Sequence, residues 1–443
     1  MAQSSKSSST KREAQVVEPR STGLTSSDPL SDEAMAHLKT YKYQSIDKSW
    51  ISNHILRHYW NAAVELLPMW LAPNMVTLLG FFCILFNILL VRVYVPDLVG
   101  PAPSWVYYSF AAGLWLYSTM DNIDGKQARR TGTSSGLGEL FDHGIDSLNC
   151  TLGSLLEATA VGLGPTRLGA FTAMVPCLPM FFSTWETYHT HTLFLGEFNG
   201  PTEGLILACL FMLVSGYFGP EIWRHRIADY AGFDAYLGDS TFLDFWLPMC
   251  LGAFFFAHLP SCVINVYHAR KKESLPMWPV FLEWIPMIVY TASICAWCSS
   301  PYSILLRENH LIIFCLTLSF TFGRLTTKII LHHLTRRSFP YFTIAIVPLV
   351  LGGIMAWLPL FGFEPVPAQY ERWYIYGYFV FAMVQYFAWA VKVINRICEV
   401  LDINCLTIKK KKVDEKEKQT FTKTKPKKGS TANGDVRATK KEL

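Results

Sequence analysis

Residues 121–146 of this 443-residue chain read DNIDGKQARRTGTSSGLGELFDHGID. The stretch lies between two long apolar segments. Its acids occur in pairs at helical spacing, Asp121 with Asp124 and then Asp142 with Asp146. Residues three or four apart project from the same face of a helix. We therefore expect two acidic helix faces, joined by the polar loop between them.

The rest of the chain has the composition of a membrane protein. Hydrophobic residues make up 51% of it and charged residues 16%, whereas soluble proteins carry about 25% charged residues. Apolar runs near the roughly 20 residues that cross a bilayer recur throughout. We expect an all-α polytopic membrane protein of about ten transmembrane helices, near residues 75–95, 104–120, 137–163, 168–187, 203–218, 243–267, 277–298, 309–332, 341–361 and 373–397.

Two different segments precede the first predicted span. Residues 1–40 are rich in serine and charged residues without an apolar period, so we expect a disordered tail. Within residues 41–70, aromatic and aliphatic residues recur at helical spacing among histidines and arginines, from Ser49 to about Leu67. This pattern predicts an interfacial amphipathic helix that lies on the membrane surface.

Basic residues gather at the C-terminus. Residues 409–443 contain 13 Lys and Arg and 5 Asp and Glu, a net charge of +8, although the whole chain carries only +5. This distribution predicts a disordered basic tail, and it argues against nucleic-acid binding, which needs basic residues along a folded groove. Lys440 and Lys441 resemble a cytosolic dilysine retrieval signal of the endoplasmic reticulum; contact with anionic lipids is the alternative.

The loops after the even-numbered spans, apart from the fourth, carry most of the basic residues between spans. Because positively charged loops stay in the cytosol, we expect both termini and residues 121–146 on the cytosolic side.

The four aspartates predict a metal site. Carboxylates that face one another in a partly apolar setting repel unless a cation lies between them. Oxygen ligands favour Mg²⁺, Mn²⁺ or Ca²⁺, and two such ions suit phosphoryl transfer. Gly125 would let backbone approach a phosphate, and Arg129 could bind a diphosphate through two hydrogen bonds. The alternative is that these acids form ordinary surface ion pairs.

The spacing of the whole set argues against that alternative. It can be written D-x2-D-G-x2-A-R-x8-G-x3-D-x3-D, and a chance match is on the order of 10⁻¹⁰ per window. The stretch resembles the signature of the CDP-alcohol phosphotransferases, and residues 41–408 resemble the eukaryotic, fungal-like choline/ethanolaminephosphotransferases. Segments that support the resemblance are residues 41–45, 72–74, 138–147 and 183–191.

The resemblance implies an activity. Phosphocholine or phosphoethanolamine would pass from CDP-choline or CDP-ethanolamine to 1,2-diacylglycerol, giving phosphatidylcholine or phosphatidylethanolamine and CMP. It also implies a homodimer in the membrane of the endoplasmic reticulum or Golgi, with a catalytic core in residues 71–200. Residues 201–408 would then supply further helices, an acceptor-lipid cavity and dimer contacts.

By motif matching, the resemblance also assigns residues. Two Mg²⁺ or Mn²⁺ ions would be held by Asp121, Asp124, Asp142 and Asp146. The substrate would meet Asn74, Gly125, Ala128, Arg129 and Gly138.

The proton acceptor has two candidates. His143 titrates near neutral pH, and Glu139 lies one helical turn before it, where a carboxylate could orient the imidazole. Asp146 is the alternative, although a metal-bound carboxylate is a weakened base. We expect His143 with Glu139.

Aromatic rings recognise a trimethylammonium group. The headgroup candidates are Trp115, Tyr117, Trp185 and Tyr188, with Glu186 to balance charge. Trp115 and Tyr117 point apart on a helix, so at most one of them can take part. The spacing leaves the choice between choline and ethanolamine open.

Two other functions compete with this prediction. A CDP-diacylglycerol-dependent phosphatidyltransferase would share the acidic signature, but those relatives are usually much shorter. A cation-coupled transporter would place its acids near the bilayer midplane, whereas these acids lie at the boundary of a predicted span.

Overall fold

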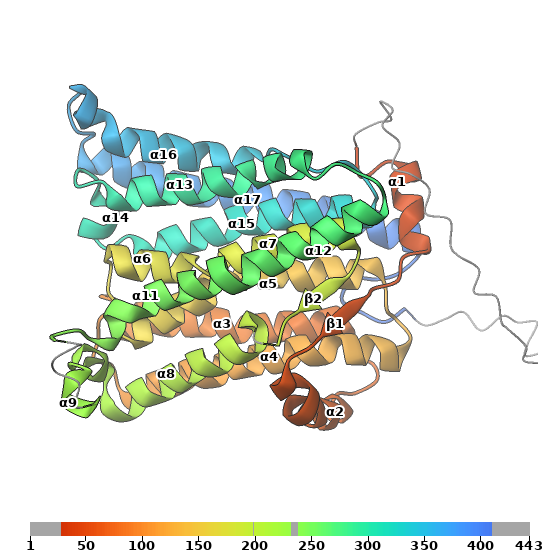
Figure 1. Cartoon of the computed structure of the whole chain (residues 1–443), viewed down its shortest axis with the longest axis horizontal. Coiled ribbons are helices and arrows are strands. Elements are labelled where there is room, and N and C mark those ends of the chain that lie inside the picture. The colour runs from red at the N-terminus through yellow and green to blue at the C-terminus, as the bar shows by residue number, and fades with distance from the viewer. Residues whose placement is uncertain (1–27, 198, 232–237, 410–443) are drawn as a thin grey trace, which may run out of the picture. The chain divides into compact units, whose positions relative to one another are not determined.

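The computed structural model describes residues 28–197, 199–231 and 238–409. Ten long helical segments run side by side (Figure 1). In chain order they are α3 (Pro73–Tyr94), α4 (Ser104–Thr131), α5 (Gly136–Ala160), α6 (Arg167–Met174) with α7 (Cys177–Thr190), α8 (Leu205–Phe218), α11 (Phe242–Ala253) with α12 (Leu259–Lys272), α13 (Ile285–Ser299), α15 (Leu311–Leu334), α16 (Val347–Trp357) and α17 (Ala368–Leu401).

Shorter elements connect or extend these segments. They are α1 (Asp32–Ala36), α2 (Arg57–Glu65), α9 (Ala228–Ala231) and α14 (Ile304–Arg307), the strands β1 (Ser45–Asp47) and β2 (Leu193–Leu195), π-helical turns at Ser52–Leu56, Gly200–Gly204 and Phe254–His258, and 3-10 turns at His37–Lys39, Pro220–Arg224, Trp278–Trp284, Ile344–Ile346 and Leu358–Phe361.

The all-α polytopic fold is confirmed. Within the described residues, eight helical segments are long and apolar enough to cross a membrane. The other two long segments are α4 and α5, of 28 and 25 residues, which extend about 42 and 38 Å at the usual rise per residue. They lie inside the same bundle, where α4 packs on α3 and α5 packs on α15. The predicted order of spans holds, and α4 continues past residue 120 through the acidic stretch.

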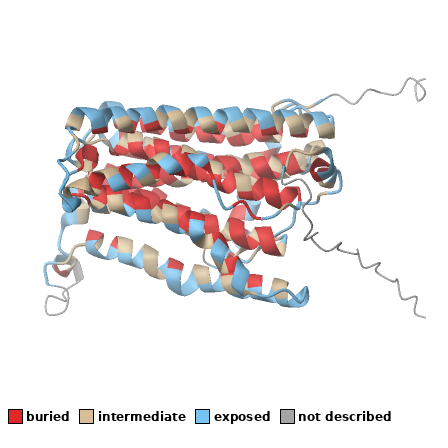
Figure 2. Ribbon diagram, turned by 90° about the horizontal axis from the view of Figure 1, so that it is seen from above, coloured by how far each residue is buried: buried red, intermediate tan, exposed pale blue. Residues whose placement is uncertain are grey.

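The outer faces of the bundle are apolar. Buried residues occupy its middle layers, while the outward faces of the outer helices are exposed (Figure 2). Large hydrophobic side chains on these faces, such as Phe86, Phe256 and Val384, are more than half exposed. Apolar surface of this extent would be unfavourable in water and suits a lipid environment. The protein is therefore a multi-pass membrane protein.

The predicted amphipathic helix is present as α2 and the π-helical turn before it. Trp60 and Val64 are buried, and α2 packs against α4. Trp50 is exposed. That this helix lies on the membrane surface stays a prediction.

The predicted boundary of the N-terminal tail is wrong. Residues 28–40 were expected to be disordered, but α1 lies within them, and Met35 and Leu38 are buried in a cluster with Leu334 of α15 and Ile397 of α17. These two apolar side chains bury enough surface to order the segment. The prediction was wrong because it used the average composition of residues 1–40, in which many serines outweigh a few apolar residues. Residues 1–27 and the predicted basic tail from residue 410 onwards lie outside the described residues.

The two short strands pair in parallel, with Ser45 beside Leu193 and Asp47 beside Leu195. The sequence analysis predicted no strand here. The ribbon ties the segment before α2 to the segment after α7 and holds both at the end of the bundle that carries the acidic stretch (Figure 1).

Candidate active site

A tight turn between α4 and α5 brings the two acidic faces together. Gly132 ends α4 in the left-handed region, at φ +67°, which glycine adopts without strain. Ser135 then caps α5, because its side-chain oxygen accepts a hydrogen bond from the backbone N–H of Gly138 at 3.4 Å. The two helices therefore reverse within a few residues, and their acids lie at the same end of the bundle.

The four aspartates lie close enough to interact electrostatically with one another. Two hydroxyl groups donate hydrogen bonds to them. Thr77 of α3 donates a hydrogen bond to Asp124, and Tyr117 of α4 donates one to Oδ1 of Asp146 at 2.5 Å. Thr77 of α3 and Tyr117 of α4 therefore help to hold the aspartates in place.

The arrangement fits a divalent cation. Oδ1 of Asp121 and Oδ1 of Asp142 are buried and have no hydrogen-bond partner, a state that is unfavourable for a carboxylate unless a cation satisfies it. Asp142, His143 and Asp146 each place one ligand atom within 4.8 Å of the others. The predicted ligand set named only the aspartates, so the structure adds His143 to the residues that could hold a metal.

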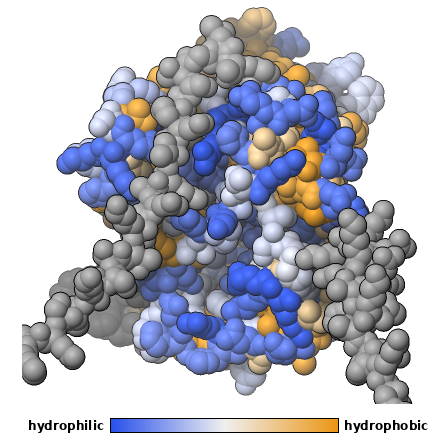
Figure 3. Space-filling view, turned by 90° about the vertical axis from the view of Figure 1, so that its right-hand side faces the viewer, coloured by the Kyte–Doolittle hydropathy of each residue, from blue (hydrophilic) through white to orange (hydrophobic). Residues whose placement is uncertain are grey.

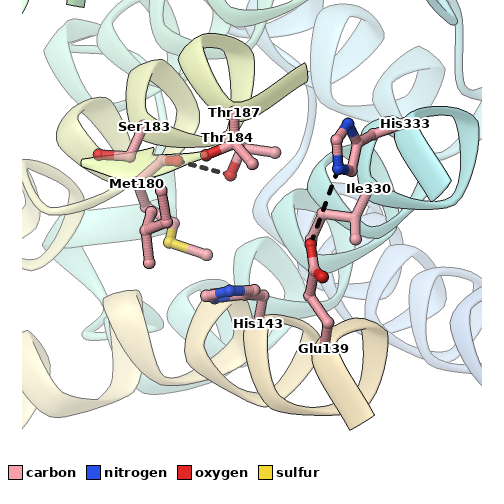
Figure 4. Close-up of a pocket in the computed structure, with 9 residues that line it drawn as sticks. Glu139, His143, Met180, Ser183, Thr184, Thr187, Ile330 and His333 are labelled. Atoms are coloured by element: carbon pink, nitrogen blue, oxygen red, sulfur yellow. Dashed lines mark hydrogen bonds and ion pairs between the residues drawn. The ribbon is translucent and has the colours of Figure 1, made fainter. Parts of the chain in front are cut away.

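The expected contact between His143 and Glu139 is not present. Nδ1 of His143 lies 3.4 Å from Oδ2 of Asp146. Glu139 instead accepts a hydrogen bond from Tyr41, and its Oε1 lies 4.0 Å from Nε2 of His333. The prediction considered only α5, whereas the partners of Glu139 come from the N-terminal segment and α15. Both side chains still line one pocket (Figure 4).

This pocket lies between α5, α7 and α15. Hydroxyl groups of α7 form one wall opposite His143 and Glu139, as Figure 4 shows. The lining residues are Glu139, His143, Met180, Ser183, Thr184, Thr187, Leu193, Ile330 and His333. The pocket therefore offers both apolar and polar contacts next to the acidic cluster.

The substrate candidates fall into two groups. In the first group, the guanidinium of Arg129 lies over Gly125, with Nη1 3.6 Å from the position that a Cβ on Gly125 would occupy. In the second group, Oδ1 of Asn74 lies 3.9 Å from the position that a Cβ on Gly138 would occupy. Asn74 also donates a hydrogen bond to the backbone oxygen of Cys405 at 3.0 Å. Asn74 is one helical turn before Thr77, so the second group adjoins Asp124.

Ala128 lies on α4, directly before Arg129. It is partly exposed, and its backbone oxygen accepts a hydrogen bond from Thr133 in the turn that follows α4.

Most of the headgroup candidates are used elsewhere. Trp185 and Tyr188 are 0% and 1% exposed; the indole N–H of Trp185 donates to Glu283 at 2.8 Å, and the hydroxyl of Tyr188 donates to the backbone of Arg337. Glu186 is buried and accepts a hydrogen bond from Asn265 at 2.6 Å. These three side chains therefore face the core between α7 and its neighbours, and the part of α7 that reaches the pocket is the hydroxyl-bearing face.

Trp115 and Tyr117 point in different directions, as predicted. Trp115 donates to the hydroxyl of Tyr59 at 3.2 Å, and Tyr117 reaches Asp146. Of the five headgroup candidates, Tyr117 alone contacts the acidic cluster.

Several residues of this site could not be identified from local spacing. Thr77, Tyr41 and His333 contact it from other elements, and the ring of Tyr43 lies 6.4 Å from that of His143. Tyr41 and Tyr43 belong to residues 41–45, one of the segments that support the family resemblance. This was the one feature of the sequence that could have pointed to them.

The surface at this end of the bundle is predominantly hydrophilic (Figure 3). Polar surface at the end of an apolar bundle marks the side that faces water. The acidic cluster therefore lies at an end of the bundle that meets water.

The fold and the site thus define a membrane-embedded protein with a carboxylate cluster suited to binding a divalent metal. Residues 70–219 match the family described as CDP-alcohol phosphatidyltransferase. The chain is 36% identical over 340 residues to cholinephosphotransferase 1 of Saccharomyces cerevisiae, which covers 74% of this chain and 86% of that protein.

Two further relatives are 32% identical to this chain, and the match extends over 99% of the length of each. They are choline/ethanolaminephosphotransferase 2 of Arabidopsis thaliana, over 86% of this chain, and choline/ethanolaminephosphotransferase 1 of Saccharomyces cerevisiae, over 87%. The chain belongs to the CDP-alcohol phosphatidyltransferase family.

Proposed function

We propose that this protein is an aminoalcohol phosphotransferase. It transfers phosphocholine, phosphoethanolamine or both from CDP-choline or CDP-ethanolamine to 1,2-diacylglycerol, which gives phosphatidylcholine or phosphatidylethanolamine and CMP. The observation that carries the proposal is the pair of buried, partnerless carboxylate oxygens on Asp121 and Asp142, in a family whose named relatives transfer these groups.

Asp121, Asp124, Asp142 and Asp146 would hold two Mg²⁺ or Mn²⁺ ions, with His143 close to the second pair. Bound divalent ions neutralise the charge of a diphosphate and of its leaving group. Arg129, lying over Gly125, adds a guanidinium that matches phosphate oxygens. Asn74, Gly138 and Ala128 would contact the nucleotide.

In the reaction, the hydroxyl oxygen of diacylglycerol bonds to the β-phosphorus of the donor. The bond from that phosphorus to the bridging oxygen breaks, and CMP leaves with its electron pair. His143 takes the hydroxyl proton through Nε2, because Nδ1 faces Asp146 at 3.4 Å. The negative charge of Glu139, one turn away, stabilises the imidazolium that forms.

The pocket beside His143 would receive the acceptor lipid. Its walls come from α5, α7 and α15, so part of the acceptor site belongs to residues 180–193 rather than to residues 201–408 alone. Among the headgroup candidates, we keep Tyr117, which touches the acidic cluster. We further propose a homodimer in the membrane of the endoplasmic reticulum, with the Golgi as the alternative, and with both termini and the site facing the cytosol.

The test is CMP release by purified protein in mixed micelles with diacylglycerol and Mg²⁺, with CDP-choline and CDP-ethanolamine offered separately. We expect activity with at least one donor, and we expect Asp146→Ala to lose it. Glu273→Ala, an exposed acid at the end of α12, serves as the matched control and should retain activity. No release with either donor from folded protein, together with activity towards CDP-diacylglycerol, would overturn the proposal.

A further inference from the structure

One contact of the site comes from outside residues 70–219. The phenol of Tyr41 donates a hydrogen bond to Oε2 of Glu139, 98 residues further along the chain. Glu139 is 7% exposed, and its other oxygen lies 4.0 Å from Nε2 of His333, beyond hydrogen-bond distance. A buried carboxylate depends strongly on the donors that satisfy it. Tyr41 is therefore well placed to set the orientation of Glu139.

Tyr41 is itself held in place from several sides. Its ring packs edge-on against the ring of His333, with 6.1 Å between the centroids. Three residues earlier, Leu38 is buried against Leu137 and Leu334, and four residues later β1 pairs with β2. Since the chain is anchored on both sides of Tyr41, the hydroxyl cannot move far from Glu139.

The protonation of Tyr41 also suits a donor. Burial and the charge of Glu139 raise the pKa of this phenol above its usual value, so it keeps its proton throughout the physiological pH range. A neutral phenol donates one hydrogen bond.

We propose that Tyr41 is a positioning residue, which holds the carboxylate of Glu139 at the wall of the pocket that Glu139 shares with His143. The N-terminal segment 28–47 is thereby part of the active site, although it precedes the segment that matches the family. The inference rests on the proposed phosphotransferase function. Without the phenol, the carboxylate of Glu139 could turn towards His333, on another wall of the same pocket.

The first experiment compares Tyr41→Phe with the wild-type protein in the CMP-release assay. The phenyl ring keeps its packing against His333 and loses only the donor. Because a hydrogen bond to a charged group is being removed, we expect kcat to fall roughly ten- to a hundredfold. The KM for the CDP-alcohol and the melting temperature should stay close to wild type.

Tyr94→Phe is the matched control. Tyr94 lies at the opposite end of α3 from Asn74 and packs against Trp105, so removal of its hydroxyl should leave kcat unchanged.

A double-mutant cycle separates positioning from a merely structural role. In Glu139→Asp, the carboxylate is withdrawn from Tyr41 by one methylene while its charge remains. If Tyr41 acts through Glu139, adding Tyr41→Phe to this variant should lower kcat less than twofold, because the contact is already lost.

The results distinguish the two proposals. A wild-type protein that is inactive with both donors would contradict the proposed function. An active wild type with an equally active Tyr41→Phe variant would overturn the role of Tyr41. The role of Tyr41 would also be overturned if the losses of kcat in Tyr41→Phe and Glu139→Asp multiplied in the double variant. The same holds if the loss of kcat in Tyr41→Phe were accompanied by a lowered melting temperature.

Discussion

The four aspartates of the acidic cluster differ in their hydrogen-bond partners. Asp124 and Asp146 each accept a hydrogen bond from a hydroxyl, that of Thr77 and that of Tyr117. Asp121 and Asp142 each keep a buried oxygen without a partner. A hydroxyl beside a metal-binding carboxylate orients it. Two of the four carboxylates are thus pre-oriented, and the other two are left to be satisfied by a cation.

This difference predicts the effect of Thr77→Val. The substitution keeps the shape of the side chain and removes the donor to Asp124. We expect the Mg²⁺ concentration for half-maximal activity to rise about tenfold, with the rate at saturating Mg²⁺ largely retained. A Mg²⁺ titration of CMP release measures this. Thr317→Val is the control, because the Thr317 hydroxyl bonds only within its own helix, to the oxygen of Ile313 at 2.7 Å. An unchanged Mg²⁺ requirement would contradict the role of Thr77.

Neighbouring helices meet where one of them carries glycine. A Cβ on Gly113 of α4 would lie 2.1 Å from the amide nitrogen of Asn87 on α3. Asn87 is 1% exposed and is bonded to Ser109 through both its amide nitrogen and its amide oxygen, each at 2.8 Å. Small residues allow such close approach of helices in membranes. The position of α4 against α3, and with it the distance from Thr77 to Asp124, depends on this contact.

We therefore expect Gly113→Ala to destabilise the protein by about 1–3 kcal/mol, because the added methyl displaces a fully bonded, buried amide. Thermal unfolding in detergent should show a melting temperature several degrees lower. The control is Gly377→Ala in α17, where a Cβ would meet nothing within 4 Å; alanine favours the helix there. Equal melting temperatures for the two variants would contradict the proposed packing role.

The proposed metal site would link the stability of the whole bundle to a bound cation. The acids lie on α4 and α5, and the groups around them come from α3, α15 and the N-terminal segment. A cation that binds only to this folded arrangement stabilises the folded state as its concentration rises. The repulsion among the carboxylates has the opposite effect when no cation is bound.

Metal removal and Asp142→Asn test this coupling. For the wild type, we expect EDTA to lower the melting temperature by several degrees and to abolish CMP release, and Mg²⁺ or Mn²⁺ to restore both. In EDTA, Asp142→Asn should be at least as stable as the wild type, because one repelling charge is gone. The variant should lose most of its response to added metal. A metal response equal to that of the wild type would exclude Asp142 as a ligand.

Local spacing was sufficient for much of the fold and for the acids of the site. The apolar runs predicted the order of the helices, because the length of a span is set by the bilayer. They did not predict that α4 continues to Thr131. The intervals among Asp121, Asp124, Asp142 and Asp146 predicted two acidic faces, because three- and four-residue intervals place side chains on one side of a helix. Both are properties of neighbouring residues.

The remaining features depend on which segments pack together. Tyr41 meets Glu139 across 98 residues and Thr77 meets Asp124 across 47, and no period in the chain relates them. Trp185 and Tyr188 were candidates for contact with the headgroup, but the packing of α7 turns their rings into the core and presents its hydroxyls to the pocket. The acidic faces follow from helix geometry within a segment, whereas their partners follow from long-range burial, which local spacing does not encode.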